Sequence, residues 1–442
     1  MTVPASGKIG LFRATMLVAG NMIGSGVFLM PAAMAQIGGI SSLGWVVALP
    51  CALLLAVVFA RLATTDPQPG GPYAWAKLRL GLYAGFHSNA LYWLGNVVAN
   101  VAIAASVVGY ASAFIPGLAT TSGTAAGVIV VIWLAAIANI AGPGAVALLE
   151  SATTLLGLAP ILAVAIAGWW WFQPDLFSLN WNPSATPPYQ AVPGALTLMF
   201  WAFTGVESAA VATDVVRDPS RNVGRATLLG VGVAAVIYIA STTVVFGLLP
   251  AERLATSAAP FETAVQAVLG TGPALVMAFC AMMKAAGALG GWSLLVAESG
   301  RVSAKDGLFV QVFARVNRRG VPVIGIVVVA VLMSGIELVS LAPTLGGLFG
   351  RLVSMSTLLL IPAYLFSSVA LAISDDQRFA MRLVGFLAAV AMVYIASTAS
   401  PGDALLALIL VLATAPLFVL NRRTARRLGS RLAGERVAAD AG

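Results

Sequence analysis

Charged residues, cysteine and histidine are all scarce in this sequence of 442 residues. Asp, Glu, Lys and Arg make up 9% of the chain, against about 25% in soluble domains, while 60% of the residues are hydrophobic. A water-soluble globular enzyme is therefore excluded. Cys51 and Cys280 lie in apolar runs, which excludes a disulfide framework and a thiolate zinc cluster. With His87 as the single histidine, we expect no metal site, no cofactor and no enzymatic activity.

The apolar residues are grouped into runs long enough to cross a membrane. At ~20 residues per span, the hydrophobic residues could fill at most ~13 spans. We predict twelve spans, near residues 12–37, 41–64, 83–114, 124–141, 146–172, 191–216, 227–250, 273–302, 322–341, 345–373, 381–399 and 402–421. The fold class is therefore an all-α integral membrane protein embedded in a lipid bilayer.

The basic residues alternate between the two sides of this predicted topology. All of the 24 Lys and Arg residues except Arg253, Lys284 and Arg351 fall at the termini or in every second connection. This is the positive-inside pattern, and it places both termini in the cytoplasm. The net charge of +8 therefore does not indicate a nucleic-acid partner.

Two spans are interrupted by glycine at corresponding positions. Gly20, Gly24 and Gly26 fall within seven residues of the first span, and Gly205 interrupts the sixth. Each glycine destabilises a helix by about 1 kcal/mol, so the helix is expected to be unwound at these positions. Unwound backbone is tolerated in a membrane only where it is buried in protein or lies beside a cavity. Close helix packing is the alternative, but it explains only the pair Gly20 and Gly24. Spans one and six begin two consecutive sets of five, as inverted repeats with a site at their interface would.

The predicted organisation follows from this repeat. Residues 1–190 form the first repeat with spans one to five, and residues 191–375 form the second with spans six to ten. Residues 376–421 add two spans, and residues 422–442 form a basic cytoplasmic tail.

An interrupted helix offers free N–H groups at the start of its second half and free C=O groups at the end of its first half. The turn from Ile23 to Gly26 is therefore expected to bind a carboxylate, and carbonyl groups between Ala202 and Gly205 are expected to bind an ammonium group. Together these two partial charges describe an α-amino acid.

Several polar and aromatic side chains stand near the two breaks. Glu207 is a carboxylate at membrane depth, which indicates function, although it could instead bond backbone amides for structure only. Trp201 and Trp292 could bind a cation through their ring faces or simply pack. Asn96 and Asn100 lie one turn apart and could bond a substrate or the neighbouring helix.

The chain resembles the amino acid-polyamine-organocation superfamily, and within it the bacterial arginine/agmatine antiporters, along almost its whole length. Six strings carry the resemblance: GNMIGSGVFLMP from Gly20, DPQPGGPYA from Asp66, LYW from Leu91, GVESA from Gly205, LGGW from Leu289, and DGLF with FARVN from Asp306.

The resemblance implies twelve helices in the leucine-transporter fold, a 5+5 inverted repeat with helices 1 and 6 unwound. It also implies a homodimer in the bacterial inner membrane that exchanges substrates without sodium. The exchange expected is that of a cationic amino acid such as arginine for its decarboxylated amine such as agmatine. A membrane receptor or a membrane-embedded enzyme is the alternative from another class.

Residue types and resemblance together predict the site. The substrate-binding residues expected are Ile23, Gly24, Ser25, Gly26, Asn96, Asn100, Ile103, Trp201, Ala202, Thr204, Gly205, Trp292 and Ser356. The resemblance makes Trp201 an outer gate and makes Tyr92, Glu207 and Tyr364 an inner gate, with Glu207 as the pH-sensitive group. By the same resemblance, Trp292, Asn100 and Ser356 contact the distal amine or guanidinium.

The chain also departs from the antiporter pattern. Asn96, Ile103 and Thr204 differ from the residues of the arginine/agmatine antiporters and could favour a shorter or more polar substrate. Lys284 and Arg351 add charge within or beside apolar segments. They could reach the membrane interface or pair with Glu207 or Glu298. Alternatively, Lys284 is a tethered cation, and the substrates are neutral or small amino acids.

Overall fold

The structure is a computed structural model, and it describes residues 9–24, 26–66, 71–183, 185–208, 216–305, 307, 309–340 and 344–419. Within these ranges the regular elements are helices, apart from one parallel bridge between Ile9 and Val216. The helices are α1 (Leu11–Met22), α2 (Gly26–Ala35), η2 (Gly39–Leu43), α3 (Gly44–Thr65), α4 (Pro72–Leu80), α5 (Leu82–Ala111), η3 (Pro116–Ala119), α6 (Thr121–Ala141), α7 (Pro143–Ala167), η4 (Gly168–Trp171), α8 (Pro174–Asn180), α9 (Pro188–Trp201), α11 (Pro219–Phe246), α12 (Ala251–Thr256), α13 (Pro260–Leu269), α14 (Thr271–Lys305), η6 (Gln311–Ala314), α15 (Val323–Val339), α16 (Leu345–Ala372), α17 (Phe379–Ser397) and a last helix, Pro401–Val419.

The described helices have the lengths and apolar composition of a membrane protein. Nine are long and apolar enough to cross a bilayer, and α1 with α2 qualifies as a tenth span that is bent by 43°. The predicted all-helical membrane architecture is therefore confirmed. At 14 and 17 residues, α9 and α15 are short for a span of ~20 residues, so the count of twelve stays a prediction.

Helix starts follow the local sequence. Proline stands in the first turn of α4, α7, α8, α9, α11 and α13, where its missing N–H group costs no helical hydrogen bond. Thr120 and Thr344 cap α6 and α16, since each hydroxyl accepts a hydrogen bond from the glycine N–H three residues later.

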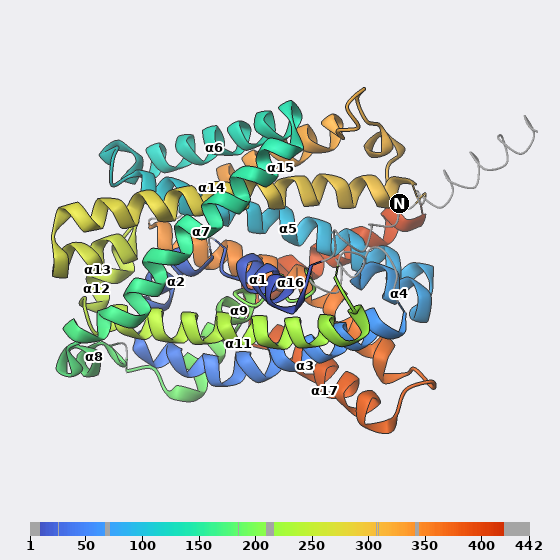
Figure 1. Ribbon diagram of the computed structural model, residues 1–442, viewed down its shortest axis with the longest axis horizontal. Coiled ribbons are helices and arrows are strands. Elements are labelled where there is room, and N and C mark those ends of the chain that lie inside the picture. The colour runs from blue at the N-terminus through green and yellow to red at the C-terminus, as the bar shows by residue number, and fades with distance from the viewer. Residues whose placement is uncertain are drawn as a thin grey trace, which may run out of the picture.

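The elements that carry the glycine interruptions lie in the middle of the molecule. Figure 1 shows α1, α9 and α16 near the centre, with α6 and α15 along one edge and α17 along the other. There α1 packs against α11, and α5 packs against both α14 and α16. Residues 20–24, 26 and 201–207 are therefore surrounded by protein on several sides.

Both predicted interruptions coincide with helix ends. The first helix, α1, ends at Met22, and α2 begins at Gly26; Ser25 lies outside the described residues. The helix α9 ends at Trp201, and residues 202–207 form turns. Gly205 has a φ of +97°, a conformation that glycine adopts without strain. Residues 209–215 are outside the described ranges.

Candidate functional site

A small, partly enclosed cavity lies where the two interrupted segments meet. Its volume is about 30 Å³, which leaves room for little more than water. It is lined by Asn21, Met22, Gly24 and Gly26 around the first interruption, by Trp201, Ala202 and Thr204 around the second, by Asn96, Ala99 and Ile103 of α5, and by Trp292 of α14. None of these lining residues has a charged side chain.

Most of the predicted site residues meet at this cavity. Gly24, Gly26, Asn96, Ile103, Trp201, Ala202, Thr204 and Trp292 line it, whereas Ile23, Asn100, Gly205 and Ser356 do not. Asn21, Met22 and Ala99 line it although the residue patterns did not single them out. Asn21 and Met22 stand in the glycine-rich run that starts at Gly20, and Ala99 directly precedes Asn100, so proximity in the sequence could have found them.

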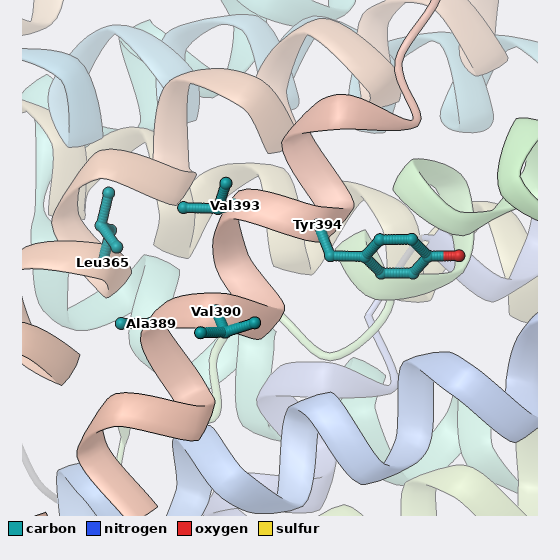
Figure 2. A pocket seen from close by; sticks show the side chains of 5 residues that line it. All are labelled: Leu365, Ala389, Val390, Val393 and Tyr394. Carbon is teal, nitrogen blue, oxygen red and sulfur yellow. The ribbon is translucent and has the colours of Figure 1, made fainter.

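Two larger pockets lie elsewhere and are apolar. One of about 440 Å³ is formed by α7, α13 and α14 and is lined by residues such as Pro160, Val268 and Met277. The other, about 340 Å³, lies between α16 and α17 and is lined by Leu365, Ala389, Val390, Val393 and Tyr394 (Figure 2). Their linings offer few polar groups that could orient an amino acid. The volume of a pocket therefore does not identify the substrate site in this protein.

Trp201 closes one side of the cavity. Its ring lies against Gly26 so closely that a Cβ atom at position 26 would overlap it. The ring also meets Phe349 edge to face, with 5.6 Å between ring centroids. Because the cavity is too small for an amino acid in this conformation, binding requires the walls to move, and the rings of Trp201 and Trp292 are the largest side chains among them.

The turn after α1 uses some of its own N–H groups. The Ile23 N–H donates to the Ala19 carbonyl oxygen at 2.7 Å, and the Gly24 N–H donates to the Met22 carbonyl oxygen at 2.7 Å. The free donors expected for a carboxylate are therefore the first N–H groups of α2, starting at Gly26.

The carbonyl groups after α9 are partly occupied by nearby hydroxyl groups. The Trp201 carbonyl oxygen accepts from the Thr204 N–H at 2.9 Å and from the Thr204 hydroxyl at 2.7 Å. The Gly205 carbonyl oxygen accepts from the Ser208 N–H at 2.9 Å and from the Ser208 hydroxyl at 2.6 Å. The Gly205 carbonyl group, which is one of those predicted to bind an ammonium group, and the Trp201 carbonyl group just before them therefore already have two donors each.

Side chains also join the two interruptions. The Asn21 amide donates to the Ser208 hydroxyl at 2.8 Å. Tyr238 of α11 donates to the carbonyl oxygens of Met22 and Ala202. The two segments are thus held together by polar contacts as well as by packing.

The predicted inner gate residues are in contact. The Tyr92 hydroxyl donates to Glu207 Oε1 at 2.7 Å, and the Tyr364 hydroxyl lies 3.3 Å from Glu207 Oε2. Glu207 is 3% exposed, so its carboxyl group is screened from solvent by α5 and α16. The Asn96 side chain donates to the Tyr92 carbonyl oxygen at 2.8 Å.

Asn100 and Ser356 are buried polar residues without hydrogen-bond partners among the residues that the structure describes. They lie on α5 and α16, which pack against each other. A buried polar group without a hydrogen bond lowers the stability of the folded protein by ~1–3 kcal/mol. The presence of two such groups in this region therefore needs an explanation. A ligand that reaches them after the cavity opens would supply it.

Lys284 is buried and does not line the cavity. It is 2% exposed, and its Nζ donates to the Thr154 hydroxyl at 2.8 Å and to the Gly20 carbonyl oxygen at 3.4 Å. Glu150, one turn before Thr154 on α7, acts on it electrostatically. Glu150 is not among the residues predicted to be functional, although a carboxylate in an apolar span is a signal that could have identified it.

The partners considered for Lys284 and Arg351 are bonded elsewhere. Glu207 is held by the two tyrosines, and Glu298 pairs with Arg301 at 2.6 Å. Arg351 is exposed at the first turns of α16. Over the described ranges, no cluster of three His, Cys, Asp or Glu side chains is arranged to hold a metal ion.

Comparison with known proteins agrees with this geometry. A family model described as amino acid permease matches residues 9–428. A cadaverine/lysine antiporter of Escherichia coli (strain K12) is 40% identical over 370 residues, which cover 82% of this chain and 83% of the relative. The putrescine transporter PotE of the same strain is 34% identical over 373 residues, covering 84% and 85%. PotE of Haemophilus influenzae is 33% identical over 368 residues, covering 83% and 85%.

Proposed function

We propose, because the chain belongs to the amino acid permease family, that it exchanges a cationic amino acid for the amine formed by its decarboxylation. The family consists of membrane transporters and not of enzymes, as predicted, and the similarity to antiporters supports amino acid and polyamine antiport. Lysine with cadaverine is the first pair to test, because a relative with that exchange in its name is 40% identical. Arginine with agmatine, the pair expected from the sequence, is the second.

One observation carries this proposal: a single cavity is lined by both interrupted segments and by two tryptophan rings. The N-terminus of α2 offers N–H groups to a carboxylate, and the end of α9 offers carbonyl oxygens to an ammonium group. The faces of Trp201 and Trp292 favour a cation, each by ~0.5–2 kcal/mol. An amino acid uses both helix ends, whereas its amine uses only the carbonyl end.

Two contacts near the cavity support alternating access. The Trp201 ring lies against Gly26, and the contact of Glu207 with Tyr92 and Tyr364 joins the segment after α9 to α5 and α16. We propose that the first contact opens toward the outside and the second toward the cytoplasm, one at a time. Exchange without sodium is part of this proposal and rests on the family resemblance.

The topology belongs to the same proposal. We propose twelve spans in a 5+5 inverted repeat with the first and sixth unwound, in the bacterial inner membrane, with both termini in the cytoplasm. The alternation of the basic loops supports this orientation. The expected homodimer remains a proposal that rests on the family resemblance.

A second candidate function is supported by Lys284. Its ammonium group bonds the Gly20 carbonyl oxygen next to the cavity-lining Asn21, so a positive charge is already held beside the first interruption. A fixed cation there would favour neutral or small amino acids over cationic ones, because like charges repel. Sequence identity to a cadaverine/lysine antiporter and to a putrescine transporter favours the first candidate function, exchange of a cationic amino acid for its amine.

A competition assay separates the two candidates. Purified protein in liposomes is loaded with lysine, and uptake of labelled cadaverine is measured against arginine, agmatine, ornithine, putrescine, alanine and serine. We expect the cationic compounds to compete at least about tenfold better than alanine or serine, equivalent to ~1.4 kcal/mol. Competition by alanine and serine alone would favour the tethered-lysine candidate. Failure of every amine and cationic amino acid would overturn the proposed function.

A further inference from the structure

A carboxylate and an ammonium group lie in the contact between α7 and α14. Glu150 is the one Asp, Glu, Lys or Arg residue of α7, and Lys284 is the one such residue of α14 between Thr271 and Ala297. The two helices pack against each other, and the two charges act on each other electrostatically. Glu150 therefore provides a countercharge for the lysine.

Each of these side chains packs on a glycine of the opposite helix. A Cβ atom at Gly291 of α14 would overlap the Glu150 carboxyl group, and a Cβ atom at Gly157 of α7 would overlap the Lys284 side chain. The missing side chains leave room for the two charged ones between the helices. Both charges are thus held at defined places.

Both charges lie beside the cavity without lining it. The ammonium group bonds the carbonyl oxygen of Gly20, which directly precedes Asn21, and the carboxylate lies against Gly291, which directly precedes Trp292. Asn21 and Trp292 line the cavity, whose lining residues carry no charged side chain. At an effective dielectric constant of about 20, a unit charge about 10 Å from a bound cation changes its affinity roughly tenfold. The balance of this pair can therefore act on a charged substrate in the cavity.

We propose that Glu150 is a specificity-determining residue, whose carboxylate cancels the charge of Lys284 and so allows the cavity to accept substrates with a net positive charge. The inference rests on the proposed exchange of a cationic amino acid for its amine. It reconciles that exchange with a lysine beside the first interruption. Without Glu150, the ammonium group of Lys284 would repel cations and would leave neutral amino acids unaffected.

The net charge of the substrate gives this role a distinct signature. At neutral pH alanine has no net charge, lysine has one positive charge and cadaverine has two. Coulomb energy is proportional to the charge of the ligand, so the factor for cadaverine is about the square of the factor for lysine. A residue that only stabilised the fold would affect all three compounds alike.

The test is Glu150→Gln, which keeps the size of the side chain and removes its negative charge. Uptake of labelled lysine into liposomes is measured against unlabelled lysine, cadaverine and alanine. We expect the inhibition constant to rise about tenfold for lysine and about a hundredfold for cadaverine, and to change less than about twofold for alanine. Equal factors for lysine and cadaverine, or no change for either, would overturn the inference.

The charge balance can also be tested from the side of the lysine. In Lys284→Met the carboxylate is left alone, so the inhibition constants should fall, and further for cadaverine than for lysine. This variant provides the measurement if Glu150→Gln does not fold. The double variant Glu150→Gln/Lys284→Met removes both charges, and its ratio of the constants for cadaverine and lysine should lie within about twofold of the wild-type ratio. A double variant that has lost the preference for cations would contradict a role through Lys284.

Glu298→Gln is the matched control, because it also removes a carboxylate and leaves a cation, Arg301, without its partner. Glu298 stands on the same helix but is partly exposed and does not line the cavity. Its constants for all three compounds should stay at the wild-type level. A change that grows with substrate charge in this variant too would show a general effect of lost negative charge and would overturn the assignment. A wild-type protein that exchanges neither lysine nor cadaverine would instead refute the proposed function.

Discussion

Gly26→Val is expected to reduce exchange by roughly tenfold or more, because a side chain at this position would overlap the Trp201 ring. Overpacking of a buried contact costs ~1–3 kcal/mol, and 1.4 kcal/mol is about tenfold in rate or affinity. Displacement of the Trp201 ring would keep the cavity from closing and would crowd the first N–H groups of α2. Counterflow of lysine against cadaverine in liposomes measures the loss.

Gly24→Ala is the matched control for this prediction. A Cβ atom there would meet only the Asn21 and Met22 carbonyl oxygens, at 3.5 Å and 3.9 Å, which are ordinary contact distances. We expect exchange within about twofold of wild type, since no ring must move. Equal activity of both variants would contradict the closing role of the contact between Trp201 and Gly26.

Glu207→Gln is expected to remove most of the pH dependence of exchange. The glutamine is close in size and can still accept hydrogen bonds from Tyr92 and Tyr364, but it cannot take up or release a proton. If Glu207 is the pH-sensitive group, the wild-type rate should change with pH across the range over which this carboxyl group takes up a proton. The rate of the variant should change less than about twofold over the same range. Initial rates of cadaverine uptake at each pH provide the comparison.

Glu298→Gln separates this effect from a general loss of negative charge. Glu298 is partly exposed and pairs with Arg301 at 2.6 Å, so it does not contact the two tyrosines. This variant should keep the pH profile of wild type. A full pH profile in Glu207→Gln would reassign the sensor to another group.

The positions of the spans could be predicted because they depend on local sequence. A membrane helix must be an apolar run of a certain length, so the run 12–37 alone indicated α1 with α2, and the run 83–114 indicated α5. The short helices α4, α8, α12 and α13 were missed, since they lie between the apolar runs and have at most 10 residues each.

The interruptions could be predicted for a different reason. Glycine destabilises a helix wherever it stands, so Gly24, Gly26 and Gly205 indicated the ends of α1 and α9 without knowledge of their neighbours. The Glu207 contact with Tyr92 and Tyr364 came from the family resemblance, because no local rule joins residues on separate spans.

The contacts that complete the site could not be predicted. Tyr238 bonds the Met22 carbonyl group across 216 positions of the chain, and Asn21 bonds Ser208 across 187. Such pairs depend on how the helices pack, and any tyrosine on an apolar span has the same sequence signal. Lys284 was noticed as a charge in a span, but its bond to Thr154 follows only from the packing of α14 on α7.

Equilibrium binding to purified protein tests the central claim most directly, namely that one cavity between two interrupted helices holds both substrates in turn. Binding of labelled lysine is measured at increasing concentrations of unlabelled cadaverine. A single site predicts that the apparent Kd for lysine rises in proportion to cadaverine without limit, while the number of lysine sites stays constant. An effect that levels off, with lysine and cadaverine bound to the same chain together, would contradict it.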